Sequence, residues 1–510
     1  MDEGNVCSFL PFATQVTMSD LVFTPAHQLA QMICERTVSS VEVLDAHLAQ
    51  IAKHNTQLNA ICTLDEERAR QRARLADEAL ARGENWGILH GVPITIKDTL
   101  ETAGLRTTAG YKPLKDYIPQ QDATAVARLR AAGAIILGKT NPAELASDYQ
   151  GINDLFARVN NPWNLNYTPG GSSSGSAAAI AGGLSPLDLC SDFGGSIRQP
   201  AHFCGVFGLK PTDRRVPTTG HILEVPGMPK CIRQMFTVGA LARSVEDLYL
   251  CLQVIAGADL YQPEIPPVPL DSPSSKSLEK RRIAWADEFC AFPVASEIKL
   301  AIQSVAKILT DVGTQVEQWI PEFDFVAAWQ IYYAVASYNL LYSEPVSFDT
   351  EFLRKMAFLF REATQGDRAL RKLSNVPGMV FPIFLNPSLK GYFEALSQRD
   401  RLIAQMDREL EQWDAWLCPV AMTPTFAHRA KGQAVTVEGK KVPYMMASGA
   451  YTVPFNLTGH PVVVIPIGQT RDGLPIGMQI VGKRWREMEL LAIAQEINKV
   501  VGGFQHPSGY

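Results

Sequence analysis

Three short segments rich in glycine, serine or proline each carry one side chain suited to acyl transfer. They span residues 91–98, 168–176 and 192–198, and the side chains are Lys97, Ser172 and Ser196. A serine hydroxyl becomes a strong nucleophile when a nearby base takes its proton, and a lysine held neutral can be that base. Together the three segments indicate a serine hydrolase whose base is a lysine rather than a histidine.

The strongest of these signals is the run Asp192-Phe193-Gly194-Gly195-Ser196. Two glycines before a serine leave successive backbone N–H groups unobstructed, and an oxyanion hole requires such groups. We therefore predict Ser196 as the nucleophile. The competing interpretation is a tight turn with an incidental serine, and the motifs that follow at 197–200 and 205–212 argue against it.

Residues 170–176 precede a run of small apolar residues, so we expect a loop that opens a helix. A phosphate-binding loop would need a preceding strand and a lysine after the glycines, and both are missing. Residues 171–175 match G-x-S-x-G, but the polar loop 161–166 is not the strand that a nucleophile elbow requires. A flexible linker would not lead directly into so apolar a helix. A functional loop is therefore favoured.

Lys97 follows a predicted buried strand, an unusual place for an ammonium group, because desolvation disfavours its charged form. The competing interpretation is a lysine that reaches solvent from the strand end and pairs with Asp98. Beside the two serine motifs, a neutral general base is the better interpretation.

The nine histidines offer no rival chemistry, because no pair or Cys/His cluster has metal-ligand spacing. We expect structural roles for His202 and His460, although each lies near a motif or an apolar strand. The net charge of −5 argues against a general nucleic-acid or anionic-membrane binder, which needs a basic face.

Nine cysteines are scattered singly, and this indicates reduced thiols and a cytoplasmic location. No apolar run approaches the roughly 18 residues of a membrane span. The acidic Asp2 and Glu3 argue against a signal peptide. Residues 1–17 lack periodicity, and we expect them to form a loose N-terminal tail before a single domain over 18–510.

Strand and helix signals alternate along much of the chain. A strand is expected at 92–96, a helix at 123–132 and a strand at 134–137, and the same alternation returns between 283 and 319. Helices with capping boxes are expected from Ser39 and from Ser244. The pattern predicts an α/β fold with a large mixed, mostly parallel sheet and helices on both faces. Residues 323–413 are expected to form a helical segment that caps the site.

The motifs resemble those of the amidase signature family over almost the whole chain. That family carries a lysine in P-x-x-x-K-D, a serine in G-G-S-S and a nucleophile in D-x-G-G-S-[IVL]-R-x-P, which match Lys97, Ser172 and Ser196. Ser172 lies 24 residues before Ser196, the family's spacing. Departures are Ser174 in place of glycine, and Asp188 and Cys190 in place of small residues.

The resemblance implies the roles of the residues. Lys97 would be the base, Ser172 would relay the proton from behind a cis peptide bond, and Ser196 would form the acyl-enzyme, without metal or cofactor. The resemblance also implies two groups of supporting residues. Phe193, Gly194, Gly195 and Ala146 would form the oxyanion and substrate-binding set, and Ser173, Ser191, Asp192 and Arg198 would surround the catalytic groups.

The resemblance leaves several functions open. The first is a stand-alone amidase that acts on a small carboxamide, which would need no nucleic acid or membrane and is compatible with a homodimer. The second is the glutamine-hydrolysing component of the tRNA-dependent amidotransferase, its A subunit, which residues 144–149 and Ser174 fit poorly. A non-catalytic scaffold and an esterase with a Ser-His-Asp triad are the remaining alternatives.

Overall fold

The computed structural model describes residues 18–222, 230–273, 275–289, 292–341 and 388–510. The predicted tail at 1–17 lies outside these residues. An 11-stranded sheet forms the centre, in the order β1-β3-β2-β6-β8-β7-β14-β15-β11-β9-β10. Its strands are β1 (Ile61–Leu64), β2 (Pro93–Lys97), β3 (Ile135–Thr140), β6 (Leu187–Asp192), β7 (Phe207–Lys210), β8 (Thr237–Ala242), β9 (Arg282–Trp285), β10 (Gln315–Gln318), β11 (Ala415–Pro419), β14 (Val462–Gln469) and β15 (Pro475–Val481). Two small hairpins, β4–β5 (Ile152–Asn153, Ala157–Arg158) and β12–β13 (Val435–Val437, Lys440–Val442), lie apart from it.

The sheet is mixed, as the alternating pattern predicts, but parallel pairs are not in the majority. Among the described strands of this sheet, the pairs β3–β2, β2–β6, β11–β9 and β9–β10 are parallel. The other six neighbouring pairs are antiparallel. The correction has a physical reason: strand–helix alternation implies parallel neighbours only where a helix crosses between them, and β14 and β15 are joined by a short turn instead.

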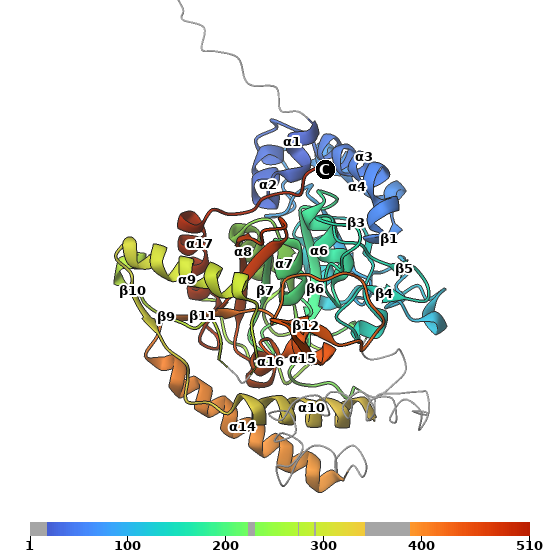
Figure 1. Ribbon diagram of the computed structural model, residues 1–510. Helices are drawn as coiled ribbons and strands as arrows, with labels where there is room; N and C mark the ends of the chain where they lie inside the picture. The colour runs from blue at the N-terminus through green and yellow to red at the C-terminus, as the bar shows by residue number, and fades with distance from the viewer. Residues whose placement is uncertain (1–17, 223–229, 274, 290–291, 342–387) are drawn as a thin grey trace, which may run out of the picture.

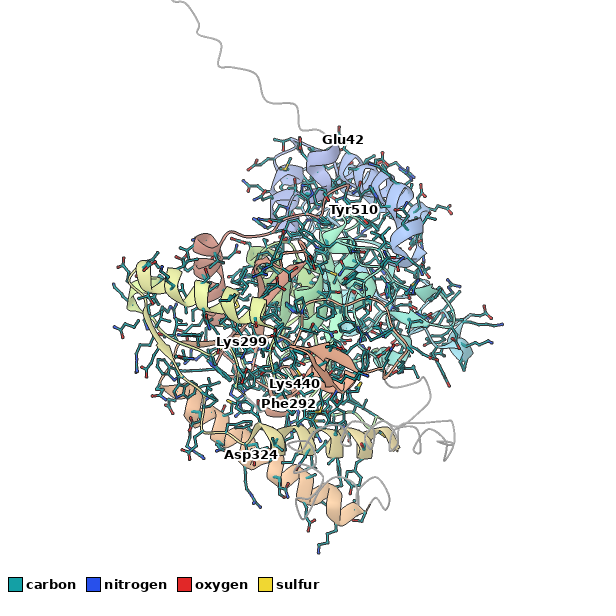
Figure 2. All side chains as sticks on the ribbon, viewed as in Figure 1. Glu42, Phe292, Lys299, Asp324, Lys440 and Tyr510 are labelled. Carbon is teal, nitrogen blue, oxygen red and sulfur yellow. The ribbon has the colours of Figure 1, made fainter. Side chains whose placement is uncertain are left out.

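Helices flank the sheet, and the C-terminus lies near α1, the first described helix (Figure 1). They are α1 (Met18–Phe23), α2 (Ala26–Cys34), α3 (Ser40–Leu58), α4 (Glu66–Ala81), α5 (Thr124–Ala131), α6 (Ser174–Ala181), α7 (Arg198–Cys204), α8 (Val245–Ile255), α9 (Ser296–Asp311), α10 (Phe325–Leu341), α14 (Leu389–Glu411), α15 (Tyr444–Gly449), α16 (Val453–Thr458) and α17 (Glu487–Val501). The ring of Tyr510 packs on His54 of α3, with centroids 4.6 Å apart, so the last residue lies against an N-terminal helix (Figure 2).

The helix signals in the sequence are accurate where a cap defines the first turn. Ser39 and Glu42 form the predicted capping box at the start of α3. Ser244 accepts from the Asp247 N–H at 3.1 Å at the start of α8. Among the described helices, none combines the length and the apolar character that a bilayer span demands.

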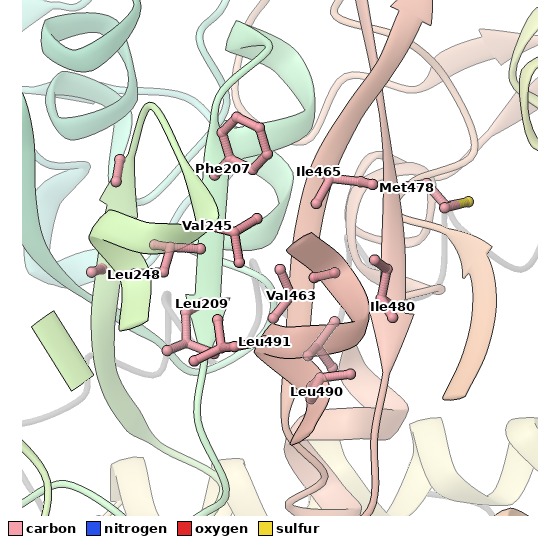
Figure 3. Packing of buried hydrophobic residues seen from close by; sticks show 14 of the residues in the cluster. Phe207, Leu209, Val245, Leu248, Val463, Ile465, Met478, Ile480, Leu490 and Leu491 are labelled. Carbon is pink, nitrogen blue, oxygen red and sulfur yellow. The ribbon is translucent and has the colours of Figure 1, made fainter. Parts of the chain in front are cut away.

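Alternating side chains of the central strands fill a core on each side of the sheet. Val463 of β14 packs with Leu490 and Leu491 of α17 (Figure 3). Its neighbour Val464 joins a separate cluster that includes Ile180 of α6. Since successive side chains of a strand point to opposite faces, β14 is buried between two helical layers.

The centre of the sheet sets the position of two predicted site segments. β2 and β6 are parallel neighbours, with Ile96 opposite Leu189. The carboxyl ends of parallel neighbours meet at one edge of a sheet. β2 therefore delivers Lys97 to the edge where β6 delivers the turn 192–196.

The segment 323–413 is partly described. It contributes α10 and α14, which pack against each other, and residues 342–387 lie outside the described part of the chain. α10 begins after Asp324, whose carboxylate accepts from the Ala327 N–H at 2.9 Å (Figure 2). α10 and α14 both contact α16 below the sheet (Figure 1). The prediction that this segment caps a site, and the division into a tail and one domain, stay predictions.

Candidate active site

A buried lysine amine surrounded by serine hydroxyls forms the centre of the site. Lys97 Nζ lies 2.7 Å from Ser172 Oγ, 3.0 Å from Ser173 Oγ and 3.3 Å from Ser191 Oγ. The Lys97 side chain is fully buried. Desolvation lowers the pKa of Lys97 to about 8, against the opposing field of the Cys190, Asp188 and Asp192 groups. The amine is thus partly neutral near physiological pH.

The competing interpretation of Lys97 as a surface lysine paired with Asp98 is wrong. Asp98 is buried, and its Oδ2 accepts from the Thr108 N–H at 3.0 Å and from the Thr108 hydroxyl. Among the described residues, Lys97 has no carboxylate within ion-pair distance. Within the described part of the chain, its amine hydrogen-bonds only hydroxyl groups, and these can exchange protons with it.

Ser172 lies on a loop that the sequence predicts to open a helix, and the loop does open α6. The Gly171–Ser172 peptide bond is cis, as the resemblance implies. The Gly171 N–H donates to Gln199 Oε1 at 3.0 Å. A Cβ at Gly171 would lie 2.5 Å from the Asp148 carbonyl oxygen, so only glycine fits there. Close backbone packing therefore fixes the residue before Ser172.

The turn that carries Ser196 is organised by a buried ion pair. Asp192 accepts from the Gly195 N–H at 2.9 Å, from the Ile197 N–H at 3.0 Å and from Arg198 Nη2 at 2.9 Å. Although burial alone would raise it, the Arg198 charge and its hydrogen bonds hold the pKa of Asp192 well below its usual range. Arg198 also donates to the Thr452 carbonyl at 2.8 Å. Asp192 and Arg198 thus hold the backbone of the turn, and their role around the catalytic groups stays a prediction.

The backbone N–H groups of residues 193–196 differ in whether they already donate a hydrogen bond. The N–H of Gly195 donates to Asp192, and a contribution of Gly195 to the oxyanion and substrate-binding set stays a prediction. Within the described residues, the N–H groups of Phe193, Gly194 and Ser196 have no acceptor. These three amides are the ones free to stabilise a developing negative charge.

Hydroxyl groups from distant elements hold the carbonyls of the same turn. Tyr332 of α10 donates to the Phe193 carbonyl at 2.9 Å. Tyr149 and Thr452 both donate to the Gly194 carbonyl at 2.7 Å. In a planar trans peptide the C=O and the N–H point in opposite directions, so Tyr332 fixes the direction of the Gly194 N–H. Sequence reasoning missed these three residues, which lie far from the turn along the chain.

Ser196 is the most accessible of the three predicted catalytic side chains. It is 7% exposed, whereas Lys97 and Ser172 are fully buried. The Ser173 N–H donates to the Ser196 carbonyl at 3.3 Å and ties the two serine loops together. A hydrogen bond between the Ser172 and Ser196 hydroxyls is absent from the described contacts. That half of the relay stays a prediction.

Two further predicted residues lie around this centre. Ala146 is in a short turn whose Ala143 N–H donates to the Ser172 carbonyl at 3.1 Å, and its own contribution to the site stays a prediction. His202 is buried, accepts from the Gly477 N–H at 2.7 Å and contacts the Thr423 carbonyl at 3.2 Å. Burial lowers the pKa of His202 to about 4, which fits its expected structural role.

The departure at Asp188 is accommodated by hydroxyl groups of the neighbouring strands. Asp188 Oδ2 accepts from Thr95 Oγ1 at 2.7 Å and from Thr140 Oγ1 at 3.0 Å. Complete burial raises the pKa of Asp188 to about 7.

One buried histidine lies behind the site without any signal in the sequence. His221 Nε2 is 2.9 Å from Ser191 Oγ, and Ser191 in turn contacts Lys97. His221 pairs with Leu100, three residues after Lys97, in an isolated β-bridge. Burial lowers the pKa of His221 well below its usual value, with nearby Lys97, Lys139 and Lys230 acting in the same direction. The imidazole is thus neutral.

Comparisons with known proteins agree with this geometry. The model of the family described as Amidase matches residues 42–491. The glutamyl-tRNA(Gln) amidotransferase A subunit of Roseiflexus sp. (strain RS-1) is 34% identical, over 94% of this chain and 97% of the relative. Its counterpart in Geobacillus thermodenitrificans (strain NG80-2), which carries the same name, is 33% identical over the same shares.

Solved structures give a second group of relatives. A 6-aminohexanoate cyclic dimer hydrolase is 27% identical with a TM-score of 0.77, covering 96% of this chain and 99% of that one. A protein solved under the name amidase is 27% identical with a TM-score of 0.75, covering 94% and 100%. Matches of this extent, together with the lysine and serine motifs at the end of β2 and β6, make the chain a member of the amidase signature family.

Proposed function

We propose that this protein hydrolyses the C–N bond of a carboxamide through an acyl-enzyme on Ser196. The observation that carries the proposal is the Lys97 amine, buried without a carboxylate partner among the described residues and 2.7 Å from Ser172 Oγ. An amine in this environment can accept a proton, which an ordinary surface lysine cannot do at neutral pH. Membership of the amidase family supports the same reaction.

The proposed chemistry runs in two steps. Neutral Lys97 takes the proton of Ser172, and Ser172 takes that of Ser196, whose oxygen adds to the amide carbonyl. The amides of Phe193, Gly194 and Ser196 receive the negative charge of that oxygen, and one such donor is typically worth about 10²–10³ in rate. The proton then passes to the leaving amine as the C–N bond breaks. Water cleaves the acyl-enzyme, so an amide and water yield a carboxylate and an amine.

Two acyl donors are candidates. The curated relatives are named as A subunits of an amidotransferase, and they support glutamine hydrolysis in a tRNA-dependent complex more strongly than the stand-alone amidase favoured from the motifs. The stand-alone amidase is supported by solved structures at 26–27% identity that are named 6-aminohexanoate cyclic dimer hydrolase. Aromatic rings beside the turn also support it: Phe193 lies 5.5 Å from Tyr332 and 6.2 Å from Phe236, centroid to centroid.

Release of ammonia or amine from a panel of amides separates these candidates. The panel contains L-glutamine and aliphatic, aromatic and amino-acid amides, with Ser196→Ala as the inactive control. Turnover of L-glutamine, together with co-purification of two partner proteins, supports the amidotransferase component. Turnover of another amide by the isolated chain supports the stand-alone amidase.

Labelling with a fluorophosphonate tests the shared chemistry without knowledge of the substrate. Intact-mass spectrometry is expected to show one adduct on Ser196. Labelling at Ser173 instead would favour a nucleophile elbow. The absence of any adduct, with no turnover of any amide, would favour the non-catalytic scaffold.

A further inference from the structure

The hydroxyl groups around Lys97 differ in whether they can donate a proton to its amine or only accept one from it. A neutral lysine amine has two N–H donors and one lone pair, yet three hydroxyl groups surround it. The lone pair can accept from only one of them. Base catalysis through Ser172 requires that the lone pair faces Ser172 and that the other two hydroxyls accept from the amine.

Ser173 meets this requirement through its own donor bond. Its hydroxyl lies 3.3 Å from the Ser191 carbonyl oxygen, which can only accept. The Ser173 proton can therefore be donated to that carbonyl. The Ser173 oxygen is left to accept an N–H of Lys97 at 3.0 Å.

Ser191 needs an acceptor of the same kind, and His221 provides it. Ser191 Oγ lies 2.9 Å from His221 Nε2, and both side chains are buried. Phe236 packs edge-on against the His221 ring, with centroids 4.5 Å apart, and helps to hold its plane. An unprotonated Nε2 accepts the Ser191 proton, and the Ser191 oxygen then accepts the second N–H of Lys97.

We infer that His221, acting through Ser191, is a positioning residue that leaves Ser172 as the one hydroxyl from which Lys97 can take a proton. The inference rests on the proposed role of Lys97 as the base. It also specifies the tautomer: the His221 ring carries its proton on Nδ1. With the opposite tautomer, Nε2 would donate to Ser191, and the Ser191 proton would compete with that of Ser172 for the lone pair.

The decisive measurement is the second-order rate of Ser196 labelling by a fluorophosphonate, with full-length protein. His221→Phe, which keeps a planar ring but has no acceptor, is expected to slow labelling about tenfold, part of the roughly 10²–10⁴-fold that a general base contributes. His221→Gln is expected to restore most of the rate, because its amide oxygen can accept the Ser191 proton. His47→Phe, the same change at a buried histidine of α3, is the matched control and is expected to label at the wild-type rate.

A double-mutant cycle separates this pathway from a loss of packing. Without the Ser191 hydroxyl, the hydrogen-bonded path from His221 to Lys97 is broken, so Ser191→Ala/His221→Phe is expected to label no more slowly than Ser191→Ala alone. The inference would be overturned if the rate losses of the two single variants multiply in the double variant. It would also be overturned if His221→Phe labels at the wild-type rate. If Lys97→Ala labels at the wild-type rate, the proposed function itself fails; the two failures are therefore distinguishable.

The tautomer gives a readout that does not depend on folding of the variants. In wild-type protein with ¹⁵N-labelled histidine, the His221 signals, identified by their loss in His221→Gln or His221→Phe, are expected to show a protonated Nδ1 and an unprotonated Nε2. A protonated Nε2 would overturn the inference. If neither variant folds, the assignment is made through the proximity of the ring to Phe236.

Discussion

At the scale of single residues, two buried lysines show how neighbours decide function. Burial lowers the pKa of both Lys97 and Lys139 to about 8. Lys139 Nζ donates to the Leu100 carbonyl and to the Thr102 and Thr107 hydroxyls. The Leu100 carbonyl has no proton to give. Lys97 faces hydroxyls alone. A lowered pKa is therefore common to both, and the proton donors around the amine distinguish the proposed base.

Removal of the Lys97 amine is expected to abolish the reaction while leaving the fold intact. Lys97→Ala should lower kcat by on the order of 10³-fold or more, because members of a catalytic triad act as a unit. Ser172→Ala should keep a residual rate, because Ser196 and the free amides of its turn remain. Steady-state kinetics check both expectations. Near-native turnover of Lys97→Ala would contradict the lysine mechanism.

The pH dependence of the reaction follows from the same amine. With a pKa of about 8, Lys97 is neutral above that pH and gains a proton as the pH falls through it. Activity should therefore be high on the alkaline side and decline towards acid, about tenfold per unit well below the pKa. Profiles of kcat/KM between about pH 6 and 10 measure this limb. A rate that is flat across the range would exclude titration of the base.

The sequence points to the proposed reacting groups more directly than to the residues that hold them in place. Short local motifs contain Lys97, Ser172 and Ser196, and such a motif can be recognised in the sequence without knowledge of the fold. His221, Tyr149 and Tyr332 reach the site through long-range packing, and no pattern in their own neighbourhoods points to it. The bond from the Gly195 N–H to Asp192 is not predicted either, since it depends on how the turn closes.

At the scale of helices and strands, the sequence predicts the existence of elements better than their direction. The box at Ser39 and the run 92–96 predict α3 and β2 to within a few residues. Strand direction depends on which strands become neighbours, and β7 pairs with β8 and β14, of which β14 comes more than 200 residues later. The hydrophobic periodicity of a strand carries no information about which strand it pairs with. The expectation that most strand pairs are parallel is therefore wrong.

Helix α10 is expected to influence catalysis through a single hydroxyl. Tyr332→Phe removes the bond to the Phe193 carbonyl but keeps the ring that packs on Phe193. The rate constant of acylation should fall by roughly tenfold, less than the loss of a full oxyanion donor, with little change in KM. Pre-steady-state or steady-state kinetics separate the two constants. A change in KM alone would instead assign Tyr332 to substrate binding.

At the scale of the whole molecule, one buried ion pair fastens the last helix to the middle of the chain. Arg215 Nη2 lies 2.9 Å from Glu487 Oε2, and both side chains are almost completely buried. Glu487 Oε1 also accepts from the Thr212 N–H at 3.0 Å. The pair therefore joins the loop after β7 to the first turn of α17, across more than half of the sequence.

Loss of one partner of this pair is expected to be costly for stability. Glu487→Ala leaves the Arg215 charge buried without compensation, and such a change typically costs about 3–5 kcal/mol. Glu496→Ala, which removes an exposed partner of Lys499, is the matched control and should cost about 0–1 kcal/mol. Chemical denaturation measures both. Equal small losses would show that Arg215 finds water or another acceptor.

The contacts that hold the turn of Ser196 come from residues that are synthesised much later than the turn itself. A growing chain has made Lys97, Ser172 and Ser196 when less than half of its length has been synthesised. The Gly194 carbonyl still lacks Thr452, and Arg198 still lacks the Thr452 carbonyl and Gln479. The three proposed catalytic residues are therefore synthesised long before the residues that hold the turn of Ser196. Under the proposed mechanism, a ribosome-bound chain therefore carries all three proposed catalytic side chains before the residues that hold the turn of Ser196 have been made.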